Sequence, residues 1–235
     1  MRKLITKNIV LKILALIILS FNSFADTKTD WTGCYLGADL NKQEASWWSR
    51  DTPNASFNDP FYDSFQKTTE FDINNVGIHF GCGKQISYFY YGGEISYAAG
   101  NHKEQHVQVG ASPLYLRSAD IDGMISFKGS FGIPVNRFLF HIDIGRVYAD
   151  TEFSDAIDSR GLGLGVDKFN EIEKTMNGWL YGIGSKYKIN DNFSLSVNYS
   201  YTNFGDVFQA IPSSNSEFGN ELTVRGFKFG ASYHF

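Results

Sequence analysis

The sequence predicts an all-β protein, an eight-stranded antiparallel up-and-down transmembrane barrel with short periplasmic turns and long extracellular loops. Eight stretches alternate between apolar and polar or small residues with a period of two, which is the pattern of strands with one apolar face. Short and long connections follow one another in strict alternation between these stretches, as they do in transmembrane barrels. None of the eight contains a run of about 18 apolar residues, so the pattern does not predict membrane-spanning helices.

The last stretch, residues 221–235, shows the alternation most clearly. Its apolar face carries Phe227, Phe229, Ala231, Tyr233 and Phe235, and the other face carries glycine, lysine, serine and histidine. This is long enough to cross a membrane, because a spanning strand needs about 9–11 residues. Lipid offers no hydrogen bonds to an open strand edge, so we expect this strand to close the barrel against the first one.

The other seven predicted strands are 33–41, 75–85, 89–98, 119–131, 138–149, 177–189 and 193–202. The short links between them are 86–88, 132–137 and 190–192, and the long polar links are 42–74, 99–118, 150–176 and 203–220. This arrangement places both termini on the periplasmic side. A secreted β-sandwich would also show short strands and turns, but strands of uniform spanning length and strictly alternating links favour the barrel.

Residues 1–25 are expected to be a secretory signal peptide. Arg2, Lys3 and Lys7 form a basic start, an apolar run covers 13–21, and residues 23–25 (SFA) form a small-x-small cleavage site. Cleavage would leave 26–235 as a single barrel domain. The alternative, an uncleaved anchor, needs a longer apolar run than this one.

The composition agrees with a β-architecture and argues against nucleic acid as a partner. The chain has 21 Phe, 13 Tyr and 23 Gly but only 5 Pro, and aromatic residues favour strands. Its net charge is −4 and it has no run rich in lysine and arginine, so it lacks the basic footprint of a nucleic-acid-binding protein.

The polar faces of the predicted strands carry charges of both signs into the barrel. The predicted lumen charge network comprises Asp39, Glu94, Lys128, Asp143, Lys186 and Lys228. Asp120, Asp122 and Lys188 are also expected to face inward. An eight-stranded interior is just wide enough for side chains, so we expect these charges to pair rather than to act as catalytic carboxylates. Arg146 and Arg225 fall on the outward parity near the outer strand ends, where a charge can reach water.

Several short motifs carry a resemblance to a known family. They are 31–37 (WTGCYLG), 178–184 (GWLYGIG), 199–206 (YSYTNFGD) and the terminal 233–235 (YHF). With them the chain resembles the small eight-stranded outer-membrane proteins of the porin-like (OmpA-like) β-barrel family common in alphaproteobacteria. The resemblance implies a location in the bacterial outer membrane, in contact with its lipid. It also implies that Tyr233 and Phe235 form the terminal signal read by the outer-membrane assembly machinery.

The two cysteines, Cys34 and Cys82, are predicted to form a disulfide. The chain is expected to enter an oxidising compartment, and both residues lie on the outward parity of adjacent strands near their periplasmic ends. Two reduced thiols are the alternative.

Aromatic residues are predicted to form belts at the two membrane interfaces. The turn-side set is Tyr88, Tyr90, Tyr91, Tyr187, Phe193, Tyr233 and Phe235, and the loop-side set is Tyr148, Phe153 and Trp179.

The predicted function is that of a structural, surface-exposed outer-membrane protein that supports membrane integrity, meets host or other surface partners through its loops, and is not a wide diffusion pore. The alternatives are a haem or small-ligand receptor and a narrow porin. His102 and His106, four residues apart in a predicted outer loop, motivate the haem alternative. No cofactor or metal is expected, and no enzymatic activity is expected because no Ser/His/Asp set could be placed on neighbouring strands.

Overall fold

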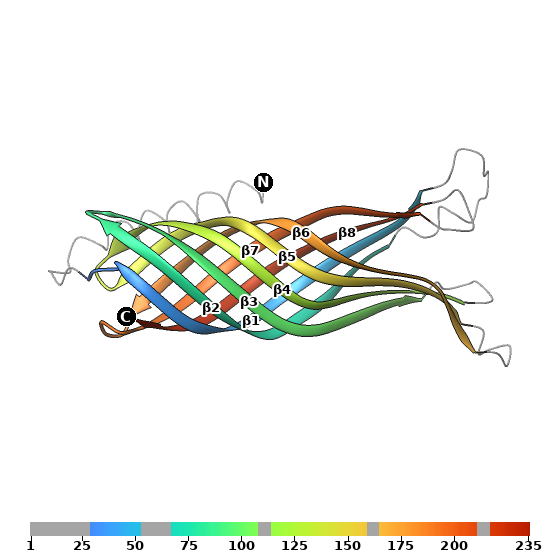
Figure 1. The fold of residues 1–235 in the computed structure, drawn as a ribbon, viewed down its shortest axis with the longest axis horizontal. Helices are drawn as coiled ribbons and strands as arrows, with labels where there is room; N and C mark the ends of the chain where they lie inside the picture. Colours follow the sequence, from blue (N-terminus) through green and yellow to red (C-terminus); the bar gives the residue numbers. More distant parts are fainter. Residues whose placement is uncertain (1–28, 53–66, 108–113, 159–164, 211–216) are drawn as a thin grey trace, which may run out of the picture.

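The computed structural model describes residues 29–52, 67–107, 114–158, 165–210 and 217–235. The expected signal peptide, residues 1–25, lies outside the described residues. The strands are β1 (Gly33–Thr52), β2 (Lys67–Ile86), β3 (Phe89–Val107), β4 (Leu114–Val135), β5 (Phe138–Asp158), β6 (Val166–Lys188), β7 (Phe193–Ala210) and β8 (Glu217–His234). Each pairs antiparallel with the next, and β8 pairs with β1, so the sheet closes into a barrel (Figure 1). The predicted fold class and strand number are confirmed.

The described residues contain no helix with the length and apolar character needed to span a bilayer.

Three tight turns join the strands at one end of the barrel, as predicted. Ser87 and Asn136 have positive φ angles of 55° and 54° and sit in the two-residue connections β2–β3 and β4–β5. The second link is thus shorter than the predicted 132–137, because both strands continue to the turn. Between β6 and β7, the Asn190 side-chain oxygen accepts hydrogen bonds from the backbone N–H groups of Asn192 (3.0 Å) and Phe193 (2.9 Å). Asparagine suits such turns because its side chain replaces a backbone acceptor.

The strands are much longer than predicted, with 18 to 23 residues each. A 20-residue strand such as β1 rises about 66 Å along its own axis, or about 47 Å along the barrel at a tilt of about 45°. The apolar band of an outer-membrane barrel is only about 25 Å tall. The predicted long loops are therefore wrong for most of their length, because residues such as 42–52 and 67–74 continue β1 and β2 beyond the membrane.

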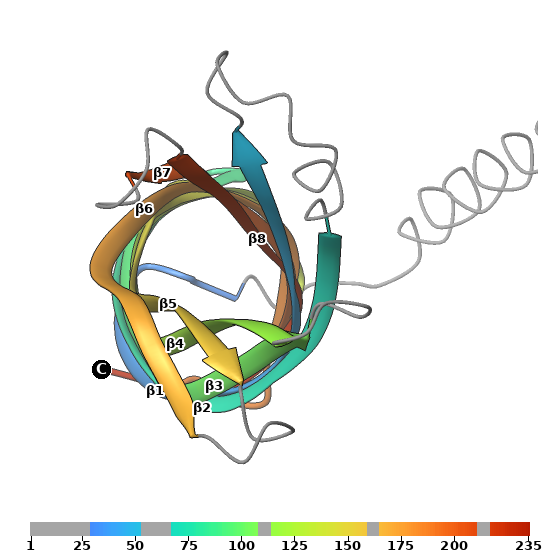
Figure 2. The ribbon, with the colours of Figure 1, turned by 90° about the vertical axis from the view of Figure 1, so that its right-hand side faces the viewer.

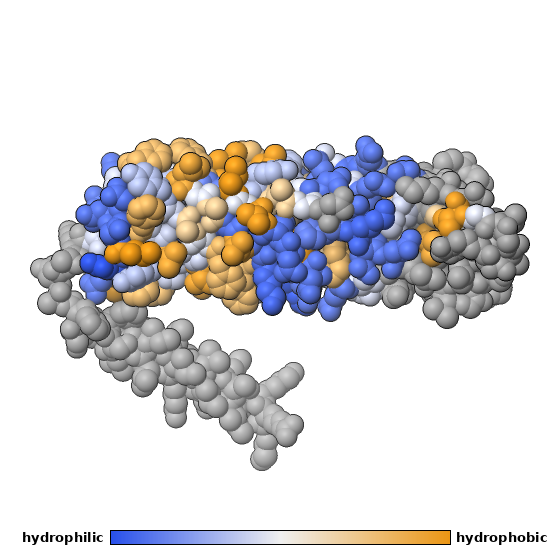
Figure 3. Space-filling view, turned by 90° about the horizontal axis from the view of Figure 1, so that it is seen from below, coloured by the Kyte–Doolittle hydropathy of each residue, from blue (hydrophilic) through white to orange (hydrophobic). Residues whose placement is uncertain are grey.

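The physical reason is that the two faces of the barrel exchange polarity along its axis. In what we call the membrane half, most outward positions are apolar and most inward positions are polar or glycine; this half comprises residues 34–40, 76–86, 89–97, 125–135, 138–144, 179–188, 193–201 and 227–235. In the remainder of the strands, the outer half, the interior is mostly apolar and the exterior mostly polar. Figure 3 shows orange residues concentrated over the turn-side half of the surface and blue ones over the other.

A buried apolar cluster fills the outer half of the barrel. It contains Ala45, Trp47, Phe71, Ile73, Ala119, Ile121, Met124, Val147, Ala149, Phe153, Met176, Leu180, Phe204, Leu222 and Val224. The Trp47 indole N–H donates to the Asn220 side-chain oxygen at 2.9 Å, so its one polar atom is satisfied. This segment therefore resembles a soluble barrel with an apolar core.

Several side chains face the opposite way from the prediction. Asp122 is exposed and Ile121 is buried, because β4 has a bulge between Ile121 and Gly123 that shifts its parity. Phe153 joins the apolar core instead of the outer aromatic belt. Tyr90 is buried at the turn end instead of lying at the interface. The other predicted belt residues lie on the outward face, and Tyr148 and Trp179 are exposed at the outer boundary.

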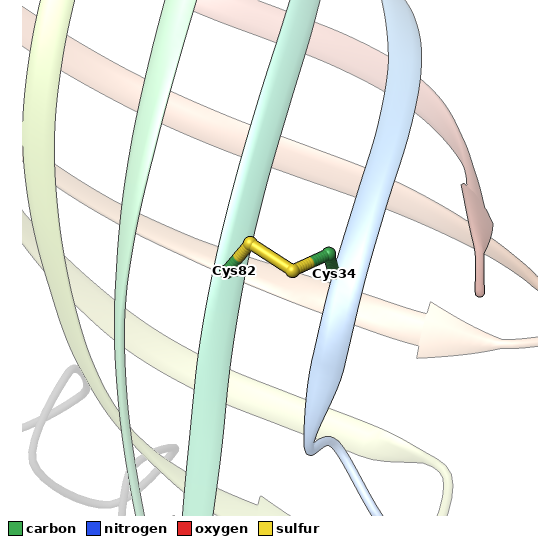
Figure 4. The surroundings of a disulfide bond; sticks show 2 residues. All are labelled: Cys34 and Cys82. Carbon is green, nitrogen blue, oxygen red and sulfur yellow. A yellow bond between two sulfur atoms is a disulfide. The ribbon is translucent and has the colours of Figure 1, made fainter.

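Cys34 and Cys82 are Cα partners on β1 and β2 and are joined by a disulfide, as predicted (Figure 4). Among the described residues no free cysteine remains. The bond ties the barrel-closing strand β1 to β2 on the lipid-facing surface of the membrane half.

Candidate functional site

The interior of the membrane half holds most of the polar chemistry of this chain, and its turn-side mouth is covered. Trp31, which precedes β1, is 2% exposed and packs in a buried cluster with Tyr90 and Leu139. Seen along the barrel axis, the blue start of the chain crosses inside the ring of strands (Figure 2). The Trp31 backbone N–H donates to the Gln85 side-chain oxygen at 3.1 Å. These contacts close the periplasmic mouth with an aromatic side chain.

A lysine secures this segment from the opposite wall. The Lys188 ammonium donates to the Asp30 carbonyl oxygen at 2.5 Å and lies 5.2 Å from the centre of the Trp31 ring. The Thr32 backbone N–H donates to the Asp30 carboxylate at 2.8 Å, and hydrogen bonds from Thr32 hold the pKa of that carboxyl below its usual range. Lys188, which was predicted to face the lumen, therefore lies at the turn-side mouth of the barrel and fixes the segment that covers it.

Above the mouth lies a connected network of charges from four strands. Lys128 on β4 pairs with Glu94 on β3 at 3.1 Å and with Asp143 on β5 at 2.8 Å. Lys186 on β6 reaches across the lumen to Glu94 at 3.4 Å. The Tyr35 hydroxyl accepts from Lys186 and donates to Glu94, both at 2.8 Å. All four charged side chains are at most 8% exposed, so the pairing is buried and its donors and acceptors are shared.

The other two members of the predicted network lie apart from it. Asp39 pairs with His79 at 2.9 Å rather than with a lysine. Lys228 lies in a neighbouring row as the Cα partner of Asn41 and Asn198, and the described residues place no carboxylate within ion-pair distance of it. The structure thus brings four of the six predicted residues into one network.

A hydrogen-bonded Ser–His–Asp chain is present, contrary to the expectation from the sequence. His79 Nδ1 lies 2.9 Å from the Asp39 carboxylate, and His79 Nε2 lies 2.8 Å from the Ser232 hydroxyl. The three residues come from β2, β1 and β8. The sequence pattern does not reveal this set, because its members meet only where β8 closes on β1, which makes Gly37 the Cα partner of both His79 and Ser232.

The chemistry of this set is that of an activated serine, but its surroundings are those of a packed interior. The order carboxylate, imidazole, hydroxyl is the arrangement used for nucleophilic catalysis. However, Ser232 and His79 are each 4% exposed, and the Tyr35 ring lies 5.9 Å from the His79 ring. A Cβ on Gly37 would overlap the His79 imidazole, so the ring lies tightly against β1. The arrangement satisfies buried polar groups and leaves the hydroxyl shielded from large substrates.

Smaller polar residues separate the charge network from the apolar core. Ser96 and Ser126 share a hydrogen bond of 2.6 Å across β3 and β4, and Asn41 donates to Asn75 at 2.7 Å. Asp120 was also expected to face inward, but it shares the outward parity of Asp122, as the Cα partner of Lys103 and Glu152, although it is buried. The interior therefore changes from an aromatic mouth through a charged layer and an amide and hydroxyl layer to an apolar cap.

The described residues provide no group of three or more His, Cys, Asp and Glu side chains placed to hold a metal ion. His102 and His106 lie within β3 and not in the predicted outer loop. The side chain of His106 lies outside the described part of the structure.

One comparison with known proteins identifies a family for this architecture. The family model described as "Outer membrane protein beta-barrel domain" matches residues 12–235, a span that includes all eight strands. A search of the curated proteins finds no match.

Among solved structures, Ail, the attachment invasion locus protein of Yersinia pestis, has 14% identity and a TM-score of 0.42, over 85% of this chain and 99% of that one. Neisserial surface protein A has 13% identity and a TM-score of 0.35, over 87% and 98%. The N-terminal β-barrel domain of Pseudomonas aeruginosa OprF has 11% identity and a TM-score of 0.34, over 87% and 98%.

Proposed function

The chain belongs to the family of outer-membrane β-barrel proteins, and we propose that it is a structural, surface-exposed member that holds its outer connections away from the lipid on a filled barrel. The exchange of polarity along the barrel carries this proposal. A protein that only sealed or spanned the membrane would need no strands beyond the apolar band. Here the outer half continues all eight strands around an apolar core, and its polar exterior suits water.

The interior supports a barrel that does not serve as a wide diffusion channel. Aqueous pores belong to barrels of about 16 to 18 strands, whereas eight strands leave an interior that side chains can fill. In this chain Trp31 covers the mouth, the Lys186 side chain crosses the lumen to Tyr35, and Trp47 and its neighbours fill the outer half. A solute would have to displace all three layers.

The outer half is well suited to present binding segments to a partner. Its exterior is charged, and Arg225 on β8 bridges Glu44 on β1 and Glu70 on β2 at 2.5 and 3.4 Å. These exposed ionic contacts link β8, β1 and β2 on the polar exterior of the outer half. We place host or other surface partners at the segments that join the strands here, one of which is 53–66, and assign no catalytic role to the lumen.

The other functions expected from the sequence gain no specific support from the described residues. The case for a haem or small-ligand receptor rests on His102 and His106 alone. Both lie in β3, and among the described residues no other strand has been identified that would supply a further haem ligand. A narrow porin would require movement of the network around Glu94.

Two measurements test the proposal. An epitope inserted into the 53–66 connection should be labelled by antibody on intact cells, and protection from antibody would contradict surface exposure. Liposomes that contain the folded protein should not swell in solutions of pentose or disaccharide sugars. Steady swelling at the rate of a general porin would overturn the filled-barrel proposal.

A further inference from the structure

A hollow lies on the lipid-facing surface of the membrane half, over β2, β3 and β4. Its volume is about 600 Å³. Three outward positions in direct register, Cys82, Gly93 and Gly129, form its floor. The outward side chains of the next row toward the outer half, Phe80, Ile95 and Phe127, form an apolar wall. The surface here is thus indented because two neighbouring strands carry no side chain at the same level.

The backbone does not require glycine at either position. Neither Gly93 nor Gly129 has a positive φ angle, and a Cβ built on either would approach no heavy atom closer than 3.9 Å. The inward Gly81 on the adjacent strand β2 differs, because a Cβ there would lie 2.5 Å from the Tyr35 hydroxyl oxygen. Packing within the chain therefore explains Gly81, whereas Gly93 and Gly129 leave open a space that only an external molecule can use.

A lone cation borders the hollow on its periplasmic side. Lys84 is the outward residue that follows Cys82 on β2, and it is the Cα partner of Tyr91 on β3. Within the described strands of the membrane half, it is the one charged side chain on the outward face. It is exposed and forms no ion pair with a described residue. Its flexible stem lets the ammonium reach the headgroup level while its methylenes remain in the apolar band.

We propose that this hollow binds an acyl chain of an anionic glycerophospholipid of the periplasmic leaflet, with the lipid phosphate paired to Lys84. The apolar floor and wall match a hydrocarbon chain, and the cation lies on the side where the periplasmic headgroups are. The arrangement combines burial of apolar surface with a charge-assisted contact at one end.

A second copy of the chain fits the same surface less well. A two-fold dimer that met across the hollow would bring Lys84 toward its own copy, since a two-fold interface uses the same patch on both partners. It would also set one concave surface against another. An anionic phospholipid has a flexible acyl chain that can fill a concave surface and a phosphate whose charge is opposite to that of Lys84. It therefore fits both the shape and the charge of this site.

Native mass spectrometry of the folded protein, with equimolar phosphatidylglycerol and phosphatidylcholine, tests the proposal. Wild type should retain one phosphatidylglycerol in preference to phosphatidylcholine. Lys84→Gln should lower that preference about fivefold, the ratio that corresponds to about 1 kcal/mol for one lysine at an anionic lipid surface. Gly93→Leu/Gly129→Leu should fill the hollow and reduce retention of both lipids.

Two matched variants serve as controls. Lys42→Gln removes an outward lysine at the opposite boundary, and Ala231→Leu adds bulk to the lipid face on β8. Both should bind lipid as wild type does, and unheated gel migration should show that every variant is folded. Equal retention of the two lipids by wild type, unchanged binding in Lys84→Gln and the double variant, or a dimer that the double variant abolishes would each overturn the proposal.

Discussion

Neutralising Glu94 should destabilise the barrel more than neutralising any exposed carboxylate. Glu94 accepts from the Tyr35 hydroxyl at 2.8 Å and pairs with Lys128 at 3.1 Å and Lys186 at 3.4 Å. In Glu94→Gln, Lys128 keeps Asp143 at 2.8 Å, but Lys186 loses the one carboxylate that the described residues place within ion-pair distance. Removal of one partner from a buried pair costs about 3–5 kcal/mol, because the other charge stays buried. We expect about 3 kcal/mol, since glutamine can still accept from Tyr35.

The assay is urea unfolding in phospholipid vesicles, with the folded fraction read from the migration of unheated samples on a detergent gel. Lys186→Met in the same chain removes the stranded ammonium and keeps a side chain of similar length, so the double variant should recover most of the loss. Glu44→Gln, which breaks the exposed contact with Arg225, is the control and should change the unfolding midpoint little. If Glu94→Gln lost no more stability than this control, the lumen charges would not be paired as described.

Three further predictions concern the disulfide, the buried serine and the C-terminus. Cys34→Ser/Cys82→Ser should lower the free energy of unfolding by about 4 kcal/mol, the chain-entropy value for a closed loop of 48 residues, while free-thiol assays of unreduced, denatured wild type should find no thiol. Ser232 should resist a fluorophosphonate probe in the folded protein because its hydroxyl is buried, and stoichiometric labelling that Ser232→Ala abolishes would instead reveal a hydrolase. Deletion of Phe235 should reduce the amount of barrel inserted in the outer membrane, and an unchanged amount would remove the terminal aromatic from the assembly signal.

The strands of the membrane half could be predicted from the sequence because their alternation of residue types is compatible with only one kind of structure. A strand whose outward residues are aromatic and aliphatic and whose inward residues include Glu94, Lys128 and Asp143 is stable only in a closed barrel in lipid. The tight turns were also predictable, since Asn136 and Asn190 favour turn conformations.

The strands of the outer half were not predicted, because an alternating pattern does not indicate which face of a strand points into the barrel. Trp47 and Ile73 continue the period-two alternation of the membrane half. They occupy inward positions, however, and in the membrane half the inward positions of the same strands are polar or glycine. Their polar neighbours, such as Glu44 and Glu70, make these segments resemble polar loops in the sequence. Only the closed register of β1 with β2 and β8 shows that these segments are strands with a reversed core.

The candidate site was predictable one strand at a time but not across strands. Parity places Asp39, His79 and Ser232 in the lumen, yet their contact depends on the relative stagger of β1, β2 and β8. A bulge adds a second limit, because one extra residue in β4 reverses the faces of Ile121 and Asp122.

The exchange of polarity along the barrel can be measured most directly with a fluorescent label on single introduced cysteines. The native disulfide leaves the introduced thiol as the one that reacts. In vesicles, brominated lipid should quench a label at Leu40→Cys, in the apolar band, but not at Glu70→Cys, which aqueous iodide should quench instead. Quenching of the Glu70 position by brominated lipid would place the outer half inside the membrane and contradict the account of a filled barrel that rises above it.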